Sequence, residues 1–158
     1  MNNFKISPIS KELADQVRLT MKDRFGKKAE VSVAGEGGYG PCRSCLRQFQ
    51  PGEKRILFSY APLQSETPYN EVGPIYIHLD NCENYSGSSF PQEIKAGRIS
   101  ISLSLRCYNN KRRMVDSVLA KNSEVETLIT NLFQNPEADV IQVRNSEAGC
   151  FITNITRA

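Results

Sequence analysis

The chain contains 158 residues, with a formal net charge of +3 at pH 7, 39% hydrophobic residues and 23% charged residues. This length and composition are typical of one soluble globular domain whose core needs no disulfide bonds. The small charge argues against a nucleic-acid-binding protein, and no apolar run approaches the ~18 residues of a membrane span.

The amino terminus and the cysteine usage bear on the compartment. The first residues include no apolar segment of the kind that a signal peptide needs. Five cysteines is an odd number for a secreted disulfide framework, so we expect thiols, thiolates or metal ligands. We therefore expect a cytoplasmic protein without membrane contact. A small molecule is a candidate partner, no nucleic acid is expected, and the oligomeric state is open.

The first part of the chain predicts a strand followed by a helix. Residues 4–9 alternate apolar and polar side chains, as a short edge strand does. Ser10 is a good N-cap for a helix from Lys11 to about Arg24, and Gly26 is expected to end this helix. The apolar stripe of the helix has members spaced by four, namely Leu13, Val17 and Met21.

A glycine-rich segment, residues 35–40, follows a predicted brief strand at Val31 and Val33. The segment lacks the Gly-Lys-Ser/Thr ending of a phosphate-binding loop, and no helix is predicted after it as in a dinucleotide-binding fingerprint. Pro41 and two cysteines follow instead. We interpret the segment as a mobile lid or an approach loop.

Most of the remaining chain is predicted to form β-strands. The predicted strands are residues 55–60, 74–80, 99–108, 114–120, 140–143 and 150–155. The strand at 99–108 alternates Ile and Leu with Ser, which predicts one buried face and one polar face. Asn109-Asn110, followed by a run of basic residues, is predicted to be a solvated hairpin turn.

Two further helical segments are predicted. Residues 91–96 suit a single helical turn. Ser123 is predicted to open a second amphipathic helix, with a capping box completed by Glu126 and an end at Asn135-Pro136. Hairpin-connected strands with two amphipathic helices predict an α+β fold, as a single domain over residues 1–158 with a mostly antiparallel β-sheet.

Four side chains of the ligand type are predicted to converge at one end of a hairpin. The strands that flank residues 61–73 are predicted to pair antiparallel, which places the start of the first beside the end of the second. Cys42 and Cys45 precede the first strand, and His78 and Cys82 end the second. All four therefore fall at the same end of the hairpin.

Three cysteines and one histidine form a Cys3His set, which is a ligand composition of structural zinc sites. Four ligands would make a closed structural site, whereas a missing ligand would leave a position for water and Lewis-acid chemistry. A carboxylate such as Asp80, Asp116 or Glu71, or a backbone carbonyl, is expected to orient His78. The preferred hypothesis is a zinc-binding protein of undetermined activity, with zinc as the candidate cofactor.

Two other hypotheses stay open. The protein is a thiol enzyme, nucleophilic or redox, if Cys42 or Cys45 attacks a substrate and His78 acts as the base. Arg43 and Arg47 would then favour a thiolate, although no helix is predicted after the first cysteine to assist, as in thioredoxin-like sites. Alternatively, the protein is a non-catalytic module that binds a small ligand or a protein, and the cysteines only pack.

Other polar and aromatic residues are candidates for a pocket. Arg106 interrupts the serine face of its strand, which indicates either an anion-binding residue or a solvated strand face. The tyrosines of the central stretch either wall a small-molecule pocket or serve as β-formers. Cys107 and Cys150 fall in strand patterns and are expected to be buried core thiols. The pocket candidates are Arg43, Tyr60, Tyr69, Glu71, Tyr76, Asp80, Tyr85, Arg106, Arg144 and Asn145.

The order of short motifs along the chain resembles the bacterial DUF1203 family. These motifs are Pro41-Cys42-Arg43-Ser44-Cys45-Leu46, Gly52-Glu53, Ser59-Tyr60, Pro68-Tyr69 with Glu71, Gly73-Pro74-Ile75 with His78, Cys82 and Tyr85, and Val143-Arg144-Asn145 with Gly149-Cys150-Phe151. The resemblance extends from about residue 4 to residue 157, and Ala148 stands where the family often has an aromatic residue. It implies a small bacterial cytosolic protein and supplies no activity, so the zinc hypothesis rests on the ligand spacing alone.

Overall fold

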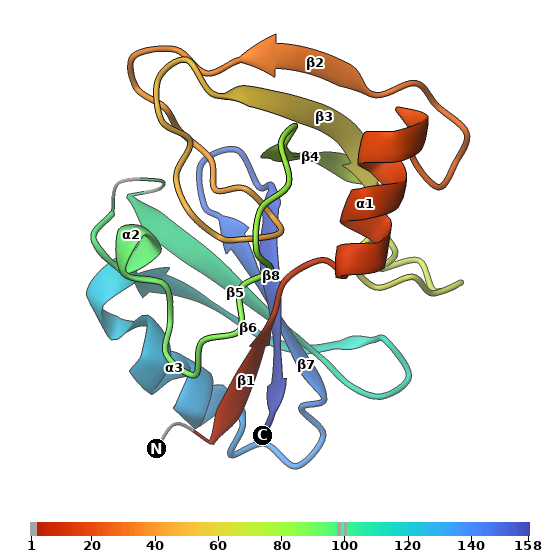
Figure 1. Ribbon diagram of the computed structural model, residues 1–158. Helices are drawn as coiled ribbons and strands as arrows, with labels where there is room; N and C mark the ends of the chain where they lie inside the picture. Colours follow the sequence, from red (N-terminus) through yellow and green to blue (C-terminus); the bar gives the residue numbers. More distant parts are fainter. Residues whose placement is uncertain (1–2, 98, 100) are drawn as a thin grey trace.

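Two antiparallel sheets form the frame of the molecule in the computed structural model, which describes residues 3–97, 99 and 101–158 (Figure 1). The five-stranded sheet has the order β1 (Phe4–Ser7), β8 (Phe151–Arg157), β7 (Val140–Asn145), β5 (Ser102–Tyr108) and β6 (Met114–Lys121). The three-stranded sheet has the order β2 (Glu30–Val33), β3 (Lys54–Tyr60) and β4 (Gly73–His78). The predicted α+β class and the antiparallel pairing are confirmed.

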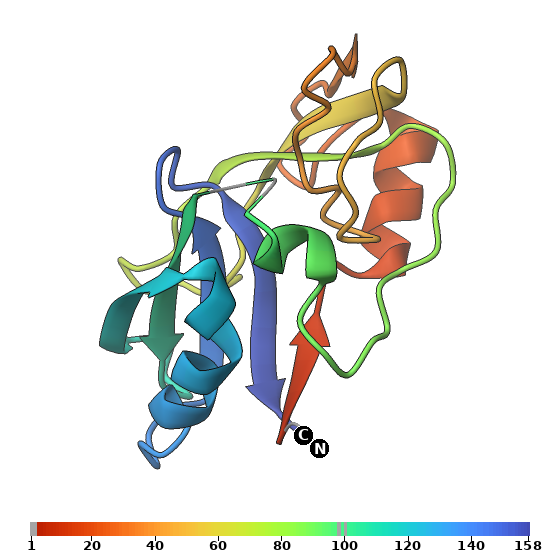
Figure 2. The ribbon, with the colours of Figure 1, turned by 90° about the vertical axis from the view of Figure 1, so that its left-hand side faces the viewer.

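The helices are divided between the two sheets. They are α1 (Lys11–Thr20), α2 (Gln92–Lys95) and α3 (Val125–Leu132), with a 3₁₀ turn η1 (Asn122–Glu124) before α3. Helices α2 and α3 cover one face of the five-stranded sheet (Figure 2). Helix α1 packs against the three-stranded sheet through Leu13, Ala14 and Val17. None of the helices within the described residues has the length and apolar character needed to cross a bilayer.

The alternation predicted for residues 99–108 is confirmed from Ser102 to Cys107, whereas Ile101, which was predicted on the buried face, is 77% exposed. Leu103, Leu105 and Cys107 are fully buried against the helices, and the residues between them are half-buried on the other face. The strand begins at Ser102, three residues later than predicted, and Ser100 lies outside the described residues. The core of this sheet therefore follows directly from the period of two.

The first helix ends earlier than predicted. Ser10 Oγ accepts a hydrogen bond from Leu13 N (3.2 Å), as expected of an N-cap. The helix stops at Thr20 because Met21 adopts a left-handed conformation with φ of 52°. The chain then reverses, and Ala29 N donates to Met21 O (2.9 Å). Gly26 therefore belongs to the turn that follows and does not end the helix.

The predicted capping box at Ser123 is wrong. This residue lies in η1, and the N-cap of α3 makes no side-chain hydrogen bond. The Glu126 carboxylate instead accepts hydrogen bonds from Phe90 N (2.8 Å) and Lys95 Nζ (2.9 Å). A tertiary contact with the α2 segment has taken the side chain that the local pattern assigned to the cap.

The loop formed by residues 39–49 joins the two hydrophobic cores. Leu46 packs in the core of the five-stranded sheet, whereas Cys42, Cys45 and Phe49 pack in the core beneath the three-stranded sheet. Figure 1 shows this loop descending from β2 to the five-stranded sheet before the chain enters β3. We call it the cysteine loop. Because both cores hold it, its cysteines have defined positions.

Candidate metal centre

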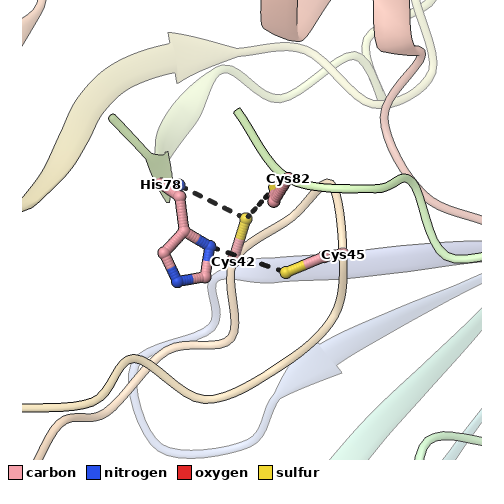
Figure 3. Close-up of side chains that lie close together, drawn as sticks. All are labelled: Cys42, Cys45, His78 and Cys82. Atoms are coloured by element: carbon pink, nitrogen blue, oxygen red, sulfur yellow. Dashed lines mark hydrogen bonds between the residues drawn. The ribbon is translucent and has the colours of Figure 1, made fainter. Parts of the chain in front are cut away.

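The structure brings the four predicted ligand residues together (Figure 3). We call Cys42, Cys45, His78 and Cys82 the Cys3His cluster. Their ligand atoms all lie within 4.8 Å of one another. The Sγ atoms of Cys42 and Cys82 are 3.8 Å apart, and Cys45 Sγ lies 3.5 Å from His78 Nδ1. The arrangement depends on the β3–β4 hairpin, in which Arg55 pairs with His78 as the antiparallel prediction requires.

Two of these distances match those expected in a tetrahedral zinc site. Sulfurs bound to one zinc ion at about 2.3 Å lie about 3.8 Å apart, and a sulfur and an imidazole nitrogen lie about 3.6 Å apart. Both short separations in the cluster match these values. Cys42, Cys45 and His78 are buried and Cys82 is half-buried. The cluster therefore has donor types and an enclosure that could hold a metal ion.

Backbone hydrogen bonds hold the cysteine loop along the outer edge of β4. Arg43 N donates to Tyr76 O (2.9 Å), and Cys42 N donates to Arg47 O (2.9 Å) to close the turn between the two cysteines. His78 N donates to Cys42 Sγ (3.3 Å). The cysteine loop therefore occupies the hydrogen-bonding edge of β4, and this edge fixes the position of Cys42 Sγ.

The glycine-rich segment packs against Phe49, which borders the Cys3His cluster. Gly38 has a φ of 68°, and a Cβ placed on it would lie 2.0 Å from Phe49 O. The Phe49 ring in turn lies 4.6 Å from the His78 ring, measured between centroids. Only glycine allows this approach. The segment interpreted as a lid or approach loop thus supports the wall of the cluster.

A carboxylate orients the histidine. His78 Nε2 lies 2.9 Å from Glu53 Oε2, which leaves Nδ1 directed at the sulfurs. Metal-bound histidines commonly donate their second nitrogen to a carboxylate in this way. The expectation that Asp80, Asp116 or Glu71 would fill this role is wrong. Glu53 was missed because it precedes its strand, although that position is opposite the end of β4.

Two arginines surround the sulfurs. Arg18 Nη2 donates to Cys82 Sγ (3.3 Å), and its Nε donates to His78 O (3.0 Å). A hydrogen bond with Cys45 raises the pKa of Arg47. Arg47 was expected near the cysteines from its position in the loop. Arg18 was not expected there, because it belongs to α1, which is distant in sequence. Its position beside the apolar stripe of that helix is the one sequence feature that could have indicated its contact with the cluster.

Hydrogen bonds within the cluster shift the pKa values of its side chains in different directions. Hydrogen bonds from Cys42 and Cys45 hold the pKa of Cys82 far below its ordinary value, whereas hydrogen bonds with Cys45 and Cys82 raise the pKa of Cys42. Burial alone would lower the pKa of His78, but hydrogen bonds with Cys45, Cys82 and Glu53 raise it to about 10. A cation bound by the cluster would compete with the protons on these side chains, because thiolates and neutral histidine are the forms that bind metal.

Arg43 lies between the two cysteines in sequence and was expected to favour a thiolate, but its guanidinium binds backbone oxygens. Its side chain is buried, and its guanidinium donates to the backbone oxygens of Phe151 (2.6 Å) and Pro41. Burial lowers the pKa of Arg43 to about 10, so the group stays protonated near pH 7. It links the cysteine loop to β8, and hence one sheet to the other.

The remaining pocket candidates do not form one pocket. Tyr76 lies beneath the Arg55 guanidinium, 4.3 Å from the ring centroid, and Asp80 is exposed. Tyr85 borders a cavity of about 270 Å³ beside Cys45. The Asn145 side chain caps the β7–β8 turn, and Tyr69 packs against Tyr108. The four remaining candidates lie at the end of the β3–β4 hairpin that is distant from the Cys3His cluster, namely Tyr60, Glu71, Arg106 and Arg144.

The two cysteines outside the cluster differ from each other. Cys107 is fully buried, as expected, and burial raises its pKa to about 11. Cys150 is half-buried and lines a cavity between the sheets, so the prediction of a core thiol is wrong for it. Cys150 directly precedes β8, and the strand pattern of the sequence gives no sign of the cavity beside it.

Comparison with known proteins supplies a family and no activity. A family model described as "Protein of unknown function (DUF1203)" matches residues 39–157. The match includes all four residues of the Cys3His cluster and Glu53. Neither the curated proteins nor the solved structures contain a significant match to the chain.

Proposed function

Because the chain belongs to the DUF1203 family, whose description assigns no activity, we propose a function from the site itself: the protein binds one zinc ion through the Cys3His cluster. The observation that carries the proposal is the convergence of the four donors. Two of the separations between their atoms equal those of a zinc tetrahedron. The carboxylate on the second nitrogen of His78 supports it further.

The chemistry of the ligands favours zinc over harder cations. Thiolates select zinc, Cu(I) and iron–sulfur clusters over Mg²⁺ and Ca²⁺, and a single tetrahedral set with one histidine suits zinc. Three thiolates, a neutral histidine and Zn²⁺ carry a net charge of −1. The nearby guanidinium groups of Arg18 and Arg47 would balance this charge.

A structural role fits the site best. The ligands come from the cysteine loop, the end of β4 and the segment after it, so one ion would tie three segments together. Four protein ligands leave no open position for substrate. We infer that zinc holds the three-stranded sheet and the cysteine loop in one arrangement.

Metal content tests the proposal. Protein purified without a histidine tag is analysed by elemental mass spectrometry as wild type, Cys45→Ser and Cys150→Ser. We expect about one zinc per chain in wild type, because four protein ligands complete one zinc site. Cys45→Ser should lose this zinc, and Cys150→Ser should keep it. Wild-type protein without metal would overturn the proposal, and rapid alkylation of one cluster cysteine near neutral pH would then favour the thiol enzyme.

The carboxylate partner of the histidine gives a separate prediction. Glu53→Ala is expected to weaken zinc affinity about 10–100-fold, because His78 loses the acceptor that orients its ring. Glu53 is half-exposed, so the fold should persist. Competition with a chromophoric chelator measures the affinity. Glu36→Ala, at an exposed carboxylate of the glycine-rich segment, is the matched control, and equal affinities in the two variants would contradict the role of Glu53.

A further inference from the structure

A second polar cluster lies at the far end of the β3–β4 hairpin. At that end Tyr60 pairs with Gly73, whereas Arg55 pairs with His78 beside the Cys3His cluster. Tyr60 lies five residues after Arg55 along β3, which is about 17 Å of strand, so the two sites are separate. The arginine cluster consists of Arg106 on β5, Arg144 on β7 and Glu71 in the loop before β4.

One carboxylate serves both guanidinium groups of the arginine cluster. Arg106 Nη1 donates to Glu71 Oε1 (3.1 Å) and Oε2 (3.0 Å), and Arg144 Nη2 lies 3.2 Å from Oε2. Two cations and one anion leave an excess of one positive charge. Burial, followed by the charge of Arg106, lowers the pKa of Arg144. Arg144 is buried and Arg106 is half-buried, and two like charges placed side by side do not stabilise the fold, so their pairing indicates a binding role.

Arg144 is held in place without Glu71. Its side chain is 8% exposed; Nε donates to Gln142 Oε1 (3.0 Å) and Nη1 donates to Gly149 O (2.9 Å). The remaining edge of the guanidinium is directed at Glu71 and has the planar shape that matches a carboxylate. The Glu71 side chain is 55% exposed, so its ion pairs are screened by water and exchange at little cost.

A cavity of about 230 Å³ adjoins Arg144 between the two sheets. Tyr60 and Phe151 form an aromatic wall, with ring centroids 5.3 Å apart, and Glu71 lies at the rim. The cavity is smaller than the ~300–1,000 Å³ of sites for drug-sized ligands. Its occupant must therefore be small, with an apolar body and an anionic end.

We propose that this cavity binds a small organic carboxylate. The carboxylate of the ligand takes the position of the Glu71 carboxylate between the two arginines, and its apolar body lies against Tyr60 and Phe151. Glu71 is then an internal competitor that occupies the arginines when the ligand is absent. This function is independent of metal binding at the other end of the hairpin.

Benzoate is the probe that tests this proposal, and benzamide is its neutral counterpart. Both are titrated into the full-length protein and followed by two-dimensional amide NMR spectra. We expect saturable shifts at Gly149 and Phe151 with benzoate and weaker binding of benzamide, which cannot pair with the arginines. Equal binding of the two probes would overturn the proposal, as would the absence of saturable shifts with benzoate.

Two glutamate variants of the same loop sharpen the test. Glu71→Gln removes the competing carboxylate and is expected to tighten benzoate binding roughly tenfold, the effect of one charge-assisted contact. Glu66→Gln changes the net charge equally at an exposed residue outside the arginine cluster, so it should leave the affinity unchanged. Equal tightening in both variants would mean a general charge effect and would contradict a site at Arg144. Arg144→Lys, confirmed to be folded by circular dichroism, should bind benzoate about tenfold more weakly, because lysine lacks the planar guanidinium that can donate to both carboxylate oxygens.

Discussion

Zinc removal by a chelator at neutral pH is expected to lower the melting temperature by roughly 10 °C or more. Structural zinc contributes on the order of 10 kcal/mol to folding, and about 3–5 kcal/mol of net loss suffices for this shift in a domain of this size. The ion would join the cysteine loop to the end of β4 and to Cys82, so its loss frees three segments at once. Scanning calorimetry of zinc-loaded and chelated protein measures the difference.

The position of the damage is part of the same prediction. Hydrogen exchange should rise in residues 39–49 and 73–85, which supply the ligands, and remain slow in the five-stranded sheet, which has its own core. Cys45→Ser should melt near the chelated wild type and should not respond to the chelator. A melting temperature of the zinc-loaded wild type that is insensitive to chelation would contradict a structural role for the ion.

Arg43→Met is expected to lower the free energy of unfolding by about 2–4 kcal/mol. The substitution leaves the buried backbone oxygens of Phe151 and Pro41 without the donor that now satisfies them. Burial already disfavours the charge, since it lowers the pKa of Arg43 to about 10, so relief of that cost offsets part of the loss. Urea unfolding followed by circular dichroism measures the change.

Two further variants separate the hydrogen bonds from the charge. Arg43→Lys keeps the positive charge but lacks the planar fork that reaches both oxygens, so it should also be destabilised. Arg113→Met makes the same substitution as the first variant at an exposed position of the β5–β6 turn and should change stability by less than about 0.5 kcal/mol. Full stability of Arg43→Lys would show that the charge matters and the hydrogen bonds do not.

The amino-acid sequence determined the features that depend on neighbours along the chain. The period of two in residues 102–108 predicts the buried face of β5, and the Ser10 cap predicts the start of α1. The convergence of the Cys3His residues also has a local origin. A hairpin needs only two adjacent strands to bring residues that precede the first beside residues that end the second.

Only the tertiary structure decided which side chains surround these elements. It placed Glu53 on His78 and Arg18 on Cys82, and it diverted Glu126 from a predicted cap to the α2 segment. It also separated the strands into two sheets, and Arg144 and its neighbours lie away from the Cys3His cluster. These partners are remote in sequence, and long-range packing selects among several carboxylates and arginines that local patterns cannot distinguish.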